Sequence, residues 1–243
     1  MLDKKKFAKI ALACGADAVG FTTAEDINKE PSNRKPLAFE EKSWEKKISP
    51  RAHFPSALGI LVVLKTFKLY NNPLKEGEVK VASSSSLDYH LELSDILEAI
   101  AKELKKDGIE SLALCDKEGL MDKEIAKRAG LGFIGKNTLL IHPEFGSSHN
   151  IGYLLLDVEV EPGQELRLDC GQCNACILAC PQKVIGENSF NAPGCLSYIT
   201  QWKDAAYTPL KGCFYGCDIC MRACPYNRVG EKNADFIFNE NEF

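Results

Sequence analysis

The stretch CGQCNACILACP, residues 170–181, decides how the last third of this chain can fold. Its cysteines follow the spacing C-x2-C-x2-C-x3-C, and they are Cys170, Cys173, Cys176 and Cys180. The end of the pattern returns in CDICMRACP, residues 217–225, which has the spacing C-x2-C-x3-C and again ends in Cys-Pro. Thiols this close together along a chain indicate metal binding more than disulfide bonds.

The two runs match the ligand pattern of bacterial two-cluster ferredoxins. In that pattern three cysteines of one run bind one [4Fe–4S] cluster, and the fourth binds the other cluster. The first cluster is therefore predicted to use Cys170, Cys173, Cys176 and Cys224. The second cluster would use Cys217, Cys220 and Cys180 and needs one further cysteine. Zinc also takes four thiolates, but it does not explain an eight-ligand set that ends twice in Cys-Pro.

The eighth ligand has two candidates, because nine cysteines lie between residues 170 and 224. A symmetrical pair of runs would have a cysteine at position 214, where the sequence has Phe214. Cys213 is therefore out of register, and we expect Cys195 to be the ligand. Cys14 and Cys115 lie outside the cysteine-rich region, and Cys14 fits an apolar helix face.

The composition is ordinary for a globular protein. The 243 residues are 45% hydrophobic and 26% charged, and 30 Lys and Arg against 34 Asp and Glu give a net charge of −4. Such a chain has no overall field that attracts nucleic acid. Met1–Lys6 does not resemble a secretory signal, and the apolar run Ala57–Leu64 is too short to span a membrane. We therefore expect a cytoplasmic protein in a reducing compartment, without a membrane partner.

Helical and strand-like patterns alternate before the cysteines. Apolar spacing predicts helices over Asp3–Cys14 and Tyr89–Leu104, and a helix that is capped by Asp122 and runs to Ala129. A proline-punctuated loop over residues 25–50 is predicted to hold one short helix near Leu37–Lys46. The predicted strands are Ala18–Phe21, Ala57–Phe67, Ser111–Cys115, Thr138–Ile141 and Gly152–Val160.

This order of elements predicts an α+β fold. We expect an α/β domain over residues 1–165, a double-cluster module over 166–230 and a C-terminal tail over 231–243. The boundary falls near Glu161–Leu166, where Pro162 and Gly163 interrupt the last strand and the composition changes to Cys, Gly and short helices.

The segment Gly130–Asn137, GLGFIGKN, matches G-x-G-x-x-G and nearly matches the phosphate loop G-x4-G-K-[ST]. Both motifs need a strand before the glycines and a helix after them, so that helix amides face phosphate. Here the predicted order is reversed, and Asn137 replaces the hydroxyl residue that binds Mg²⁺. We therefore do not expect nucleotide binding, and we assign the glycines to a turn or to close passage of the backbone.

Several segments together resemble the epoxyqueuosine reductase family. The segments that carry the resemblance are Asp88-Tyr89-His90, Leu114–Ile141 with its AGLGFIGKNTL, Cys195–Thr200, Tyr215–Cys220 and the cysteine runs. The resemblance implies a nitroreductase-like α/β domain that binds cobalamin near one of two [4Fe–4S] clusters. It also implies that Cys195 is the eighth cluster ligand and that Cys213 is spare.

The resemblance implies site residues as well. Asp116 matches the proton donor of the family, and burial beside the corrin would raise the pKa of its carboxyl group, which must be neutral to donate. The expected cofactor-binding residues are Asp88, Tyr89, His90, Gly135, Lys136, Asn137 and Ser147.

The chain departs from the family pattern in three places. Lys123 stands where the family has an arginine that contacts substrate, and Ser83–Ser86 with Leu87 replaces a stretch containing glycine and arginine. We also expect this protein to lack the C-terminal helical-repeat domain that the family uses near tRNA. From these departures and the net charge, we do not expect tRNA as a partner.

The leading hypothesis is a cobalamin-dependent iron–sulfur reductase. Electrons from a ferredoxin- or flavodoxin-type donor would pass through two [4Fe–4S] clusters to a corrinoid that reduces an electrophilic substrate. The alternative is an electron-transfer protein that serves a partner, for example a corrinoid protein, and has no substrate of its own. A third hypothesis is a minimal epoxyqueuosine reductase that acts on tRNA.

Overall fold

The computed structural model describes residues 1–28, 44–70, 75–85, 88–116, 119–201, 211–227, 229–230 and 237–239. The chain divides into two compact units, each built from several segments. The first, called the sheet unit, contains Met1–Thr66, His90–Phe133 and Asn150–Leu168. The second, called the cysteine unit, contains Phe67–Tyr89, Ile134–His149 and Asp169–Phe243.

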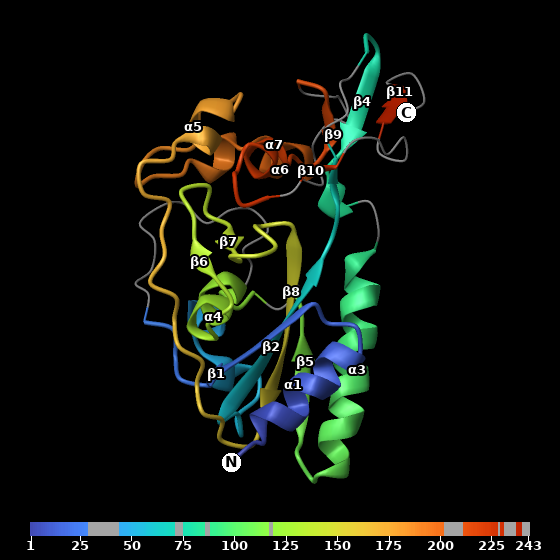
Figure 1. Cartoon of the computed structure of the whole chain (residues 1–243), viewed down its shortest axis with the longest axis vertical. Coiled ribbons are helices and arrows are strands. Elements are labelled where there is room, and N and C mark those ends of the chain that lie inside the picture. Colours follow the sequence, from blue (N-terminus) through green and yellow to red (C-terminus); the bar gives the residue numbers. More distant parts are fainter. Residues whose placement is uncertain are drawn as a thin grey trace. The chain divides into compact units, whose positions relative to one another are not determined.

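A four-stranded sheet forms the core of the sheet unit (Figure 1). Its order is β1 (Ala18–Thr23), β2 (Gly59–Thr66), β8 (His149–Leu156) and β5 (Ser111–Leu114). β1 pairs antiparallel with β2, and β5 pairs antiparallel with β8. The side chains of β2 from Ile60 to Leu64 are fully buried. The continuous apolar run of β2 is explained by helices that cover both faces of the sheet.

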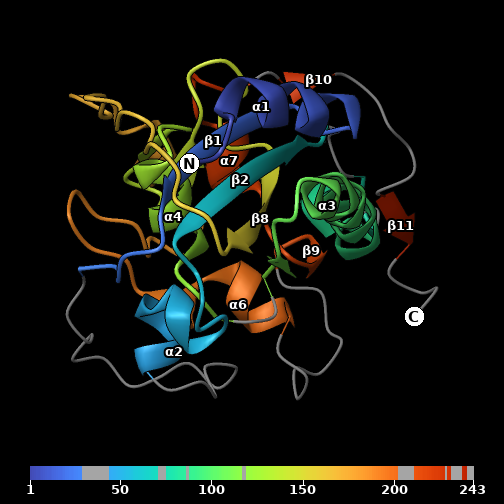
Figure 2. The same ribbon diagram turned by 90° about the horizontal axis from the view of Figure 1, so that it is seen from below.

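Helices α1 (Lys4–Ala13) and α3 (Tyr89–Lys106) lie on one face of this sheet, and α4 (Asp122–Arg128) lies on the other (Figure 2). A Cβ atom added to Gly152 would lie 3.1 Å from Leu97 of α3, whereas one added to Gly20 would lie 2.6 Å from the backbone oxygen of Ala129, just after α4. Gly20 thus faces the side of the sheet that carries α4, and Gly152 faces the side that carries α3. The glycines therefore let a helix or its following loop approach each face closely.

The first helices follow their sequence signals. Asp3 caps α1, because its carboxylate accepts the backbone N–H of Lys6, and Phe7 and Ala11 are buried below it. Helix α3 buries five residues at helical spacing, namely Leu93, Ile96, Leu97, Ile100 and Leu104. A short α2 (Trp44–Ile48) and a 3₁₀ turn η1 (Pro50–Ala52) precede β2. Most of the helix predicted near Leu37–Lys46 lies outside the described residues.

Short helices and small sheets make up the cysteine unit. The helices are α5 (Ala175–Ala179), α6 (Leu196–Gln201) and α7 (Ile219–Arg222), with 3₁₀ turns η2 (Ser83–Ser85) and η3 (Ala192–Gly194). Strand β4 (Glu78–Val81) lies between β11 (Ile237–Asn239), antiparallel, and β9 (Cys213–Tyr215), parallel. β3 (Leu69–Tyr70) pairs with β10 (Val229–Gly230), and β6 (Phe133–Ile134) pairs with β7 (Leu140–Ile141). The cysteine-rich segment thus takes partners from much earlier in the chain.

Three details differ from the sequence prediction. Asp122 is not the N-cap of α4: Met121 holds that position, and Asp122 accepts a hydrogen bond from the Tyr153 hydroxyl at 2.7 Å. Thr138 has a φ of 62° and belongs to a turn, so β7 begins only at Leu140. β8 begins at His149 and ends at Leu156, earlier than the predicted Gly152–Val160.

The predicted end of α4 is confirmed. Gly130 follows the C-cap Ala129 with a φ of 80°, as expected of a C′ glycine.

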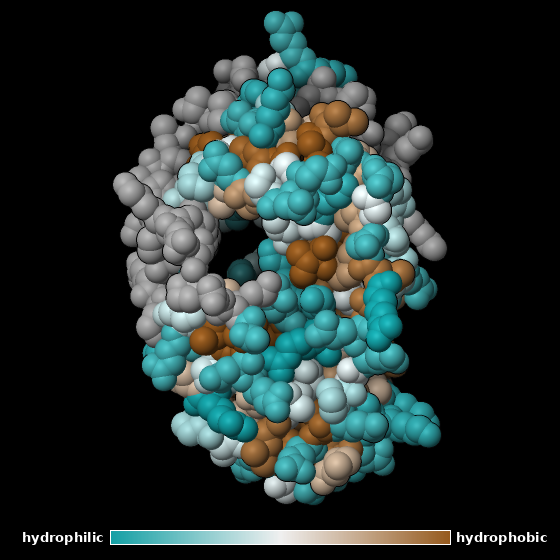
Figure 3. Space-filling model, turned by 90° about the vertical axis from the view of Figure 1, so that its left-hand side faces the viewer, coloured by the Kyte–Doolittle hydropathy of each residue, from teal (hydrophilic) through white to brown (hydrophobic). Residues whose placement is uncertain are grey.

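Exposed apolar side chains are scattered. The large ones include Leu12, Leu58, Leu91, Leu168 and Leu178. The face in Figure 3 shows hydrophobic spots separated by hydrophilic side chains. Single exposed residues of this kind are normal for globular proteins. No helix among the described residues combines the length and the apolar character needed to cross a membrane.

Candidate metal centres

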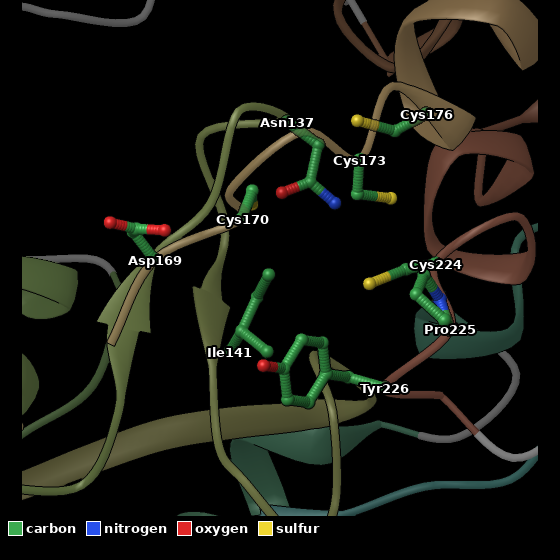
Figure 4. Close-up of a pocket in the computed structure, with 9 residues that line it drawn as sticks. All are labelled: Asn137, Ile141, Asp169, Cys170, Cys173, Cys176, Cys224, Pro225 and Tyr226. Carbon is green, nitrogen blue, oxygen red and sulfur yellow. The ribbon is translucent and has the colours of Figure 1, made fainter.

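The four cysteines predicted to bind the first cluster line one pocket of the cysteine unit (Figure 4). The pocket holds about 60 Å³, several times the roughly 10–15 Å³ that one water molecule needs. Its lining consists of Cys170, Cys173, Cys176, Cys224, Asn137, Ile141, Asp169, Pro225 and Tyr226. Four thiols from two distant runs therefore surround one space, as a cluster with four thiolate ligands requires.

Local hydrogen bonds shape the loop that carries the first three thiols. Gly171 has a φ of 49°, and its N–H donates to Asp169 Oδ1 at 2.6 Å. The Cys173 N–H donates to the Cys170 carbonyl at 3.0 Å and closes a turn. α5 begins two residues later, so that Cys176 lies in its first turn. The C-x2-C-x2-C spacing thus becomes a tight turn that leads into a helix.

A second turn, Gly135–Leu139, contributes Asn137 to the lining of the pocket. The Thr138 N–H donates to the Gly135 carbonyl at 2.9 Å, and the Gly135 N–H donates to the Leu139 carbonyl at 2.9 Å. A Cβ atom on Gly135 would lie only 2.5 Å from Ile141 Cδ1. Glycine at this position therefore lets the turn fold back closely onto β7.

Lys136 joins this turn to the cysteine loop. Its backbone N–H donates to Cys170 Sγ at 3.5 Å, and its ammonium group donates to the Gly171 carbonyl at 3.0 Å and to Asn174 Oδ1 at 2.9 Å. The same ammonium group lies 2.7 Å from Glu187, and this hydrogen bond raises the pKa of Lys136. From the sequence, Lys136 was predicted only as a cofactor-binding residue, since no local pattern links residue 136 to residue 170.

The thiols predicted for the second cluster also lie near one another. Cys180, Cys195 and Cys220 pack against a buried group formed by Cys176, Val184 and Ile185. Burial raises the pKa of Cys220 to about 12, and neighbouring thiolates, first Cys217, add to the effect. Burial likewise raises the pKa of Cys195. Thiols in this state bind iron with release of protons, because the thiolate is the metal ligand.

Cys213 lies next to the second group of thiols. It is fully buried on β9 and shares a hydrogen bond with Cys217. That bond lowers the pKa of Cys213 to about 7 and, together with burial, raises the pKa of Cys217. Cys217 also contributes to the raised pKa of Cys195, so Cys195 and Cys213 both lie near Cys217. Their proximity does not distinguish the two, and Cys195 remains the predicted ligand.

A buried ion network adjoins Cys217. The Asp218 side chain is 2% exposed, accepts the Ser83 hydroxyl at 2.8 Å and pairs with Arg222 at 2.5 Å and with Lys80 at 3.7 Å. Burial lowers the pKa of Lys80, and the nearby Asp218 carboxylate opposes this. Sequence reasoning missed this network, because Lys80 and Ser83 come from β4 and η2, more than a hundred residues before Asp218.

The predicted acid Asp116 lies in the sheet unit, two residues after β5. It is exposed and has a φ of 50°, a left-handed conformation that is uncommon for residues other than glycine. The preceding Cys115 is buried, and its sulfur lies 3.9 Å from Nδ1 of the half-buried His90. The sheet unit therefore contains two of the predicted site residues, namely Asp116, which follows Cys115 in the sequence, and His90, whose ring lies near the Cys115 sulfur.

The other predicted cofactor residues belong to the cysteine unit. Asp88 is exposed and Tyr89 is half-buried at the start of α3. Gly135, Lys136 and Asn137 belong to the Gly135–Leu139 turn, of which Asn137 lines the thiol pocket. Ser147 is 4% exposed; its N–H donates to Asn227 Oδ1 at 2.6 Å, and its hydroxyl accepts Asn227 Nδ2 at 3.0 Å. Ser147 is thereby tied to the loop that follows Cys224.

Comparison with known families defines the class of protein. Residues 169–227 match the family described as a 4Fe–4S double cluster binding domain. The matched segment contains every cysteine of the two thiol groups. This match supports the binding of [4Fe–4S] clusters by the cysteine unit, and the thiol pocket is the part of the structure that agrees with it.

Curated relatives extend the likeness over nearly the whole chain. An epoxyqueuosine reductase of Listeria monocytogenes is 34% identical over 98% of this chain and 67% of the relative, and one of Staphylococcus aureus is 30% identical over 98% and 68%. The structure of epoxyqueuosine reductase from Streptococcus thermophilus matches with a TM-score of 0.82 and 35% identity, over 97% of this chain and 69% of that one. This chain belongs to the epoxyqueuosine reductase family and is an oxidoreductase.

Two further solved structures are relevant, one to the predicted partner and one to the fold. One is an epoxyqueuosine reductase in complex with an epoxyqueuosine-modified tRNA-Tyr stem loop, at 28% identity and a TM-score of 0.81, over 92% of this chain and 65% of that one. It runs counter to our expectation that tRNA is not a partner. A catabolic reductive dehalogenase at 17% identity and a TM-score of 0.65 covers 92% of this chain and 32% of the dehalogenase, and it shares the fold.

Proposed function

We propose that this protein reduces epoxyqueuosine carried by tRNA, using two [4Fe–4S] clusters and cobalamin. The observation that carries the proposal is the pocket where Cys170, Cys173, Cys176 and Cys224 meet. An epoxide that loses its oxygen as water takes up two electrons and two protons. Clusters supply electrons one at a time, so two clusters in one module suit this demand.

The proposed ligand sets are those of the sequence prediction. The first cluster is bound by Cys170, Cys173, Cys176 and Cys224, and the second by Cys180, Cys195, Cys217 and Cys220. The donor set fits, because all eight are thiols within the segment that matches the double-cluster domain. When bound, cobalamin would supply a cobalt centre that accepts these electrons and reduces the epoxide.

The proposed contacts to cobalamin are the seven residues named in the sequence prediction. Asp88, Tyr89 and His90 at the start of α3 carry polar atoms suited to the amide-bearing rim of a corrin. Gly135 and Asn137 belong to the turn on the wall of the thiol pocket. Lys136 and Ser147 already bond the loops around the first cluster, so their part in cobalamin binding would be to hold those loops.

Asp116 is the proposed proton donor. Its carboxyl group is exposed on a turn with left-handed backbone geometry, and strained backbone of this kind is concentrated at functional sites. A relative from Bacillus subtilis, 28% identical with a TM-score of 0.83, was solved with an aspartate-bearing catalytic loop swung out of its active site. That description of a relative supports a catalytic role for an aspartate on a loop, which we propose for Asp116.

Replacing Asp116 by Asn tests the proposal. Asn tolerates left-handed backbone and keeps the shape of Asp, but it cannot donate a carboxyl proton. With reconstituted protein under anaerobic conditions, we expect Asp116→Asn to bind cobalamin normally, as measured by absorbance, and to lose at least a hundredfold in turnover of an epoxyqueuosine-modified tRNA stem loop. The exposed Asp95→Asn on α3 is the matched control and should keep both properties.

Two outcomes would contradict the proposal in different ways. Turnover that is unchanged in Asp116→Asn removes this carboxyl group from the mechanism. Cluster signals in electron paramagnetic resonance without any uptake of cobalamin would instead favour an electron carrier that serves a partner.

A further inference from the structure

Asn137 is a buried amide with one group that lacks a hydrogen-bond partner. Its side chain is 4% exposed and lines the pocket of the first four thiols. Within the part of the chain that the structure describes, Nδ2 has no hydrogen-bond acceptor. A buried N–H group without an acceptor costs free energy, so such a group in a folded protein calls for an explanation.

The orientation of this amide is set by its oxygen. Oδ1 accepts the backbone N–H of Leu139 at 3.3 Å, within the tight turn Gly135–Leu139. Since the oxygen is held by the turn, the nitrogen is directed into the pocket, on the side of Cys173 and Cys224 (Figure 4). A flipped amide would lose the bond to Leu139 and would aim an oxygen at thiolates instead.

The same turn presents a second donor to the pocket. The backbone N–H of Lys136 donates to Cys170 Sγ, and the Lys136 ammonium group holds the cysteine loop through Gly171 and Asn174. Asp169 also lines the pocket, but its carboxylate is exposed and accepts the Gly171 N–H. The buried groups that the turn directs at the sulfur atoms are therefore N–H donors.

We propose that Asn137 donates a hydrogen bond from Nδ2 to a sulfur atom of the cluster bound by Cys170, Cys173, Cys176 and Cys224, and that this bond raises the reduction potential of that cluster. The reduced cluster carries one more negative charge than the oxidised one. An N–H donor stabilises the more negative state, and hydrogen bonds to sulfur are among the factors that set cluster potentials. The inference rests on the proposed ligand set, but it does not depend on the substrate or on cobalamin.

One consequence concerns the order of electron transfer. Among the described residues, the hydrogen bonds of Lys136 in this turn go to Cys170 and to the loop after it, so the turn is expected to act on the first cluster. Raising the potential of this cluster above that of its neighbour would direct electrons from the Cys180–Cys195–Cys217–Cys220 cluster to the first one. Asn137 is thus a positioning and tuning residue for the electron path, not a catalytic residue.

The test is a redox titration of both clusters, followed by electron paramagnetic resonance, in three variants. Asn137→Leu keeps the volume and removes the donor, and Asn137→Asp keeps the shape and the acceptor for Leu139 but replaces the donor by a charged oxygen. We expect the potential of one cluster to fall in Asn137→Leu by about 59 mV, a tenfold change in the ratio of reduced to oxidised cluster. Asn137→Asp should lower it further, and the exposed Asn188→Leu should leave both potentials unchanged.

Iron content is measured in parallel, so that cluster loss is not mistaken for a shift. Unchanged potentials in Asn137→Leu and Asn137→Asp, or equal shifts of both clusters, would overturn the proposal. Loss of about four irons in both variants would also overturn it, because Asn137 would then be needed for assembly. The potential of one cluster could shift in the Asn137 variants while the unsubstituted protein fails to reduce modified tRNA. That result would support this inference and contradict the proposed function.

Discussion

Cys213 shows how spacing and spatial position can point in different directions for a single residue. Its position in the sequence excludes it from the C-x2-C register, yet the structure places it beside Cys217. Buried thiols near a cluster can be ligands, or they can be small apolar side chains that fill the core. Removing each candidate thiol separately distinguishes the two roles.

We predict that Cys195→Ala loses iron and that Cys213→Ala does not. If Cys195 binds the second cluster, its loss should reduce iron from about eight to about four per chain, because an incomplete cubane is unstable. Cys213→Ala should retain about eight irons and both cluster signals. Colorimetric iron analysis of anaerobically reconstituted protein measures this. Iron loss confined to Cys213→Ala would exchange the two assignments.

At the scale of elements, α3 is the clearest case of sequence that determines structure. Its apolar residues repeat at helical spacing, and those residues are buried in the sheet unit. Leu97 is 1% exposed and touches the position of Gly152 on β8, whereas Leu91 on the same helix is 65% exposed. The two leucines differ in burial and share a helix, so they form a matched pair.

We predict that Leu97→Ala destabilises the protein by about 2–5 kcal/mol, since it removes buried methylene groups and leaves a cavity. Leu91→Ala should change the stability by less than about 0.5 kcal/mol, as exposed substitutions usually do. Chemical denaturation followed by circular dichroism under anaerobic conditions gives both values. Equal effects of the two substitutions would contradict the packing of α3 described above.

For the whole molecule, the cysteine-rich segment does not make its unit alone. β4 from the first third of the chain pairs with β9, and the Gly135–Leu139 turn provides a wall of the thiol pocket. Asp218 is buried against Lys80 and Ser83 from these early segments. Without them, the Asp218 carboxylate would lose two of its partners, and removing partners from a buried charge is costly.

We therefore predict that residues 169–243, produced alone, hold clusters poorly. After anaerobic reconstitution, this fragment should retain less than half of the iron of the full chain and should lose it faster to a chelator. The full chain, treated in parallel, is the control. A fragment with about eight irons and unchanged potentials would show that the early segments are dispensable.

The sequence by itself determined the features that depend on short separations along the chain. The cysteine spacings predicted the thiol group of the first pocket, and apolar periodicity predicted α1, β2 and α3. The glycine-containing and cysteine-containing motifs identified the family, which the relatives confirm. Such features follow from local geometry, because helix and loop spacing fix which neighbours share a face. The helix before Gly130 was predicted correctly, whereas β6, which lies inside the glycine segment, was not predicted.

Only the tertiary structure decided which distant residues act on the thiols. Lys136 meets the Cys170 loop, Asn137 directs an amide at the pocket, and Lys80 and Ser83 bury Asp218, although no short-range pattern connects these positions. Their contacts form when the chain closes loops of 34 to 135 residues. The free energy of such closure depends on the packing of the whole unit, which the spacing of neighbouring residues does not encode.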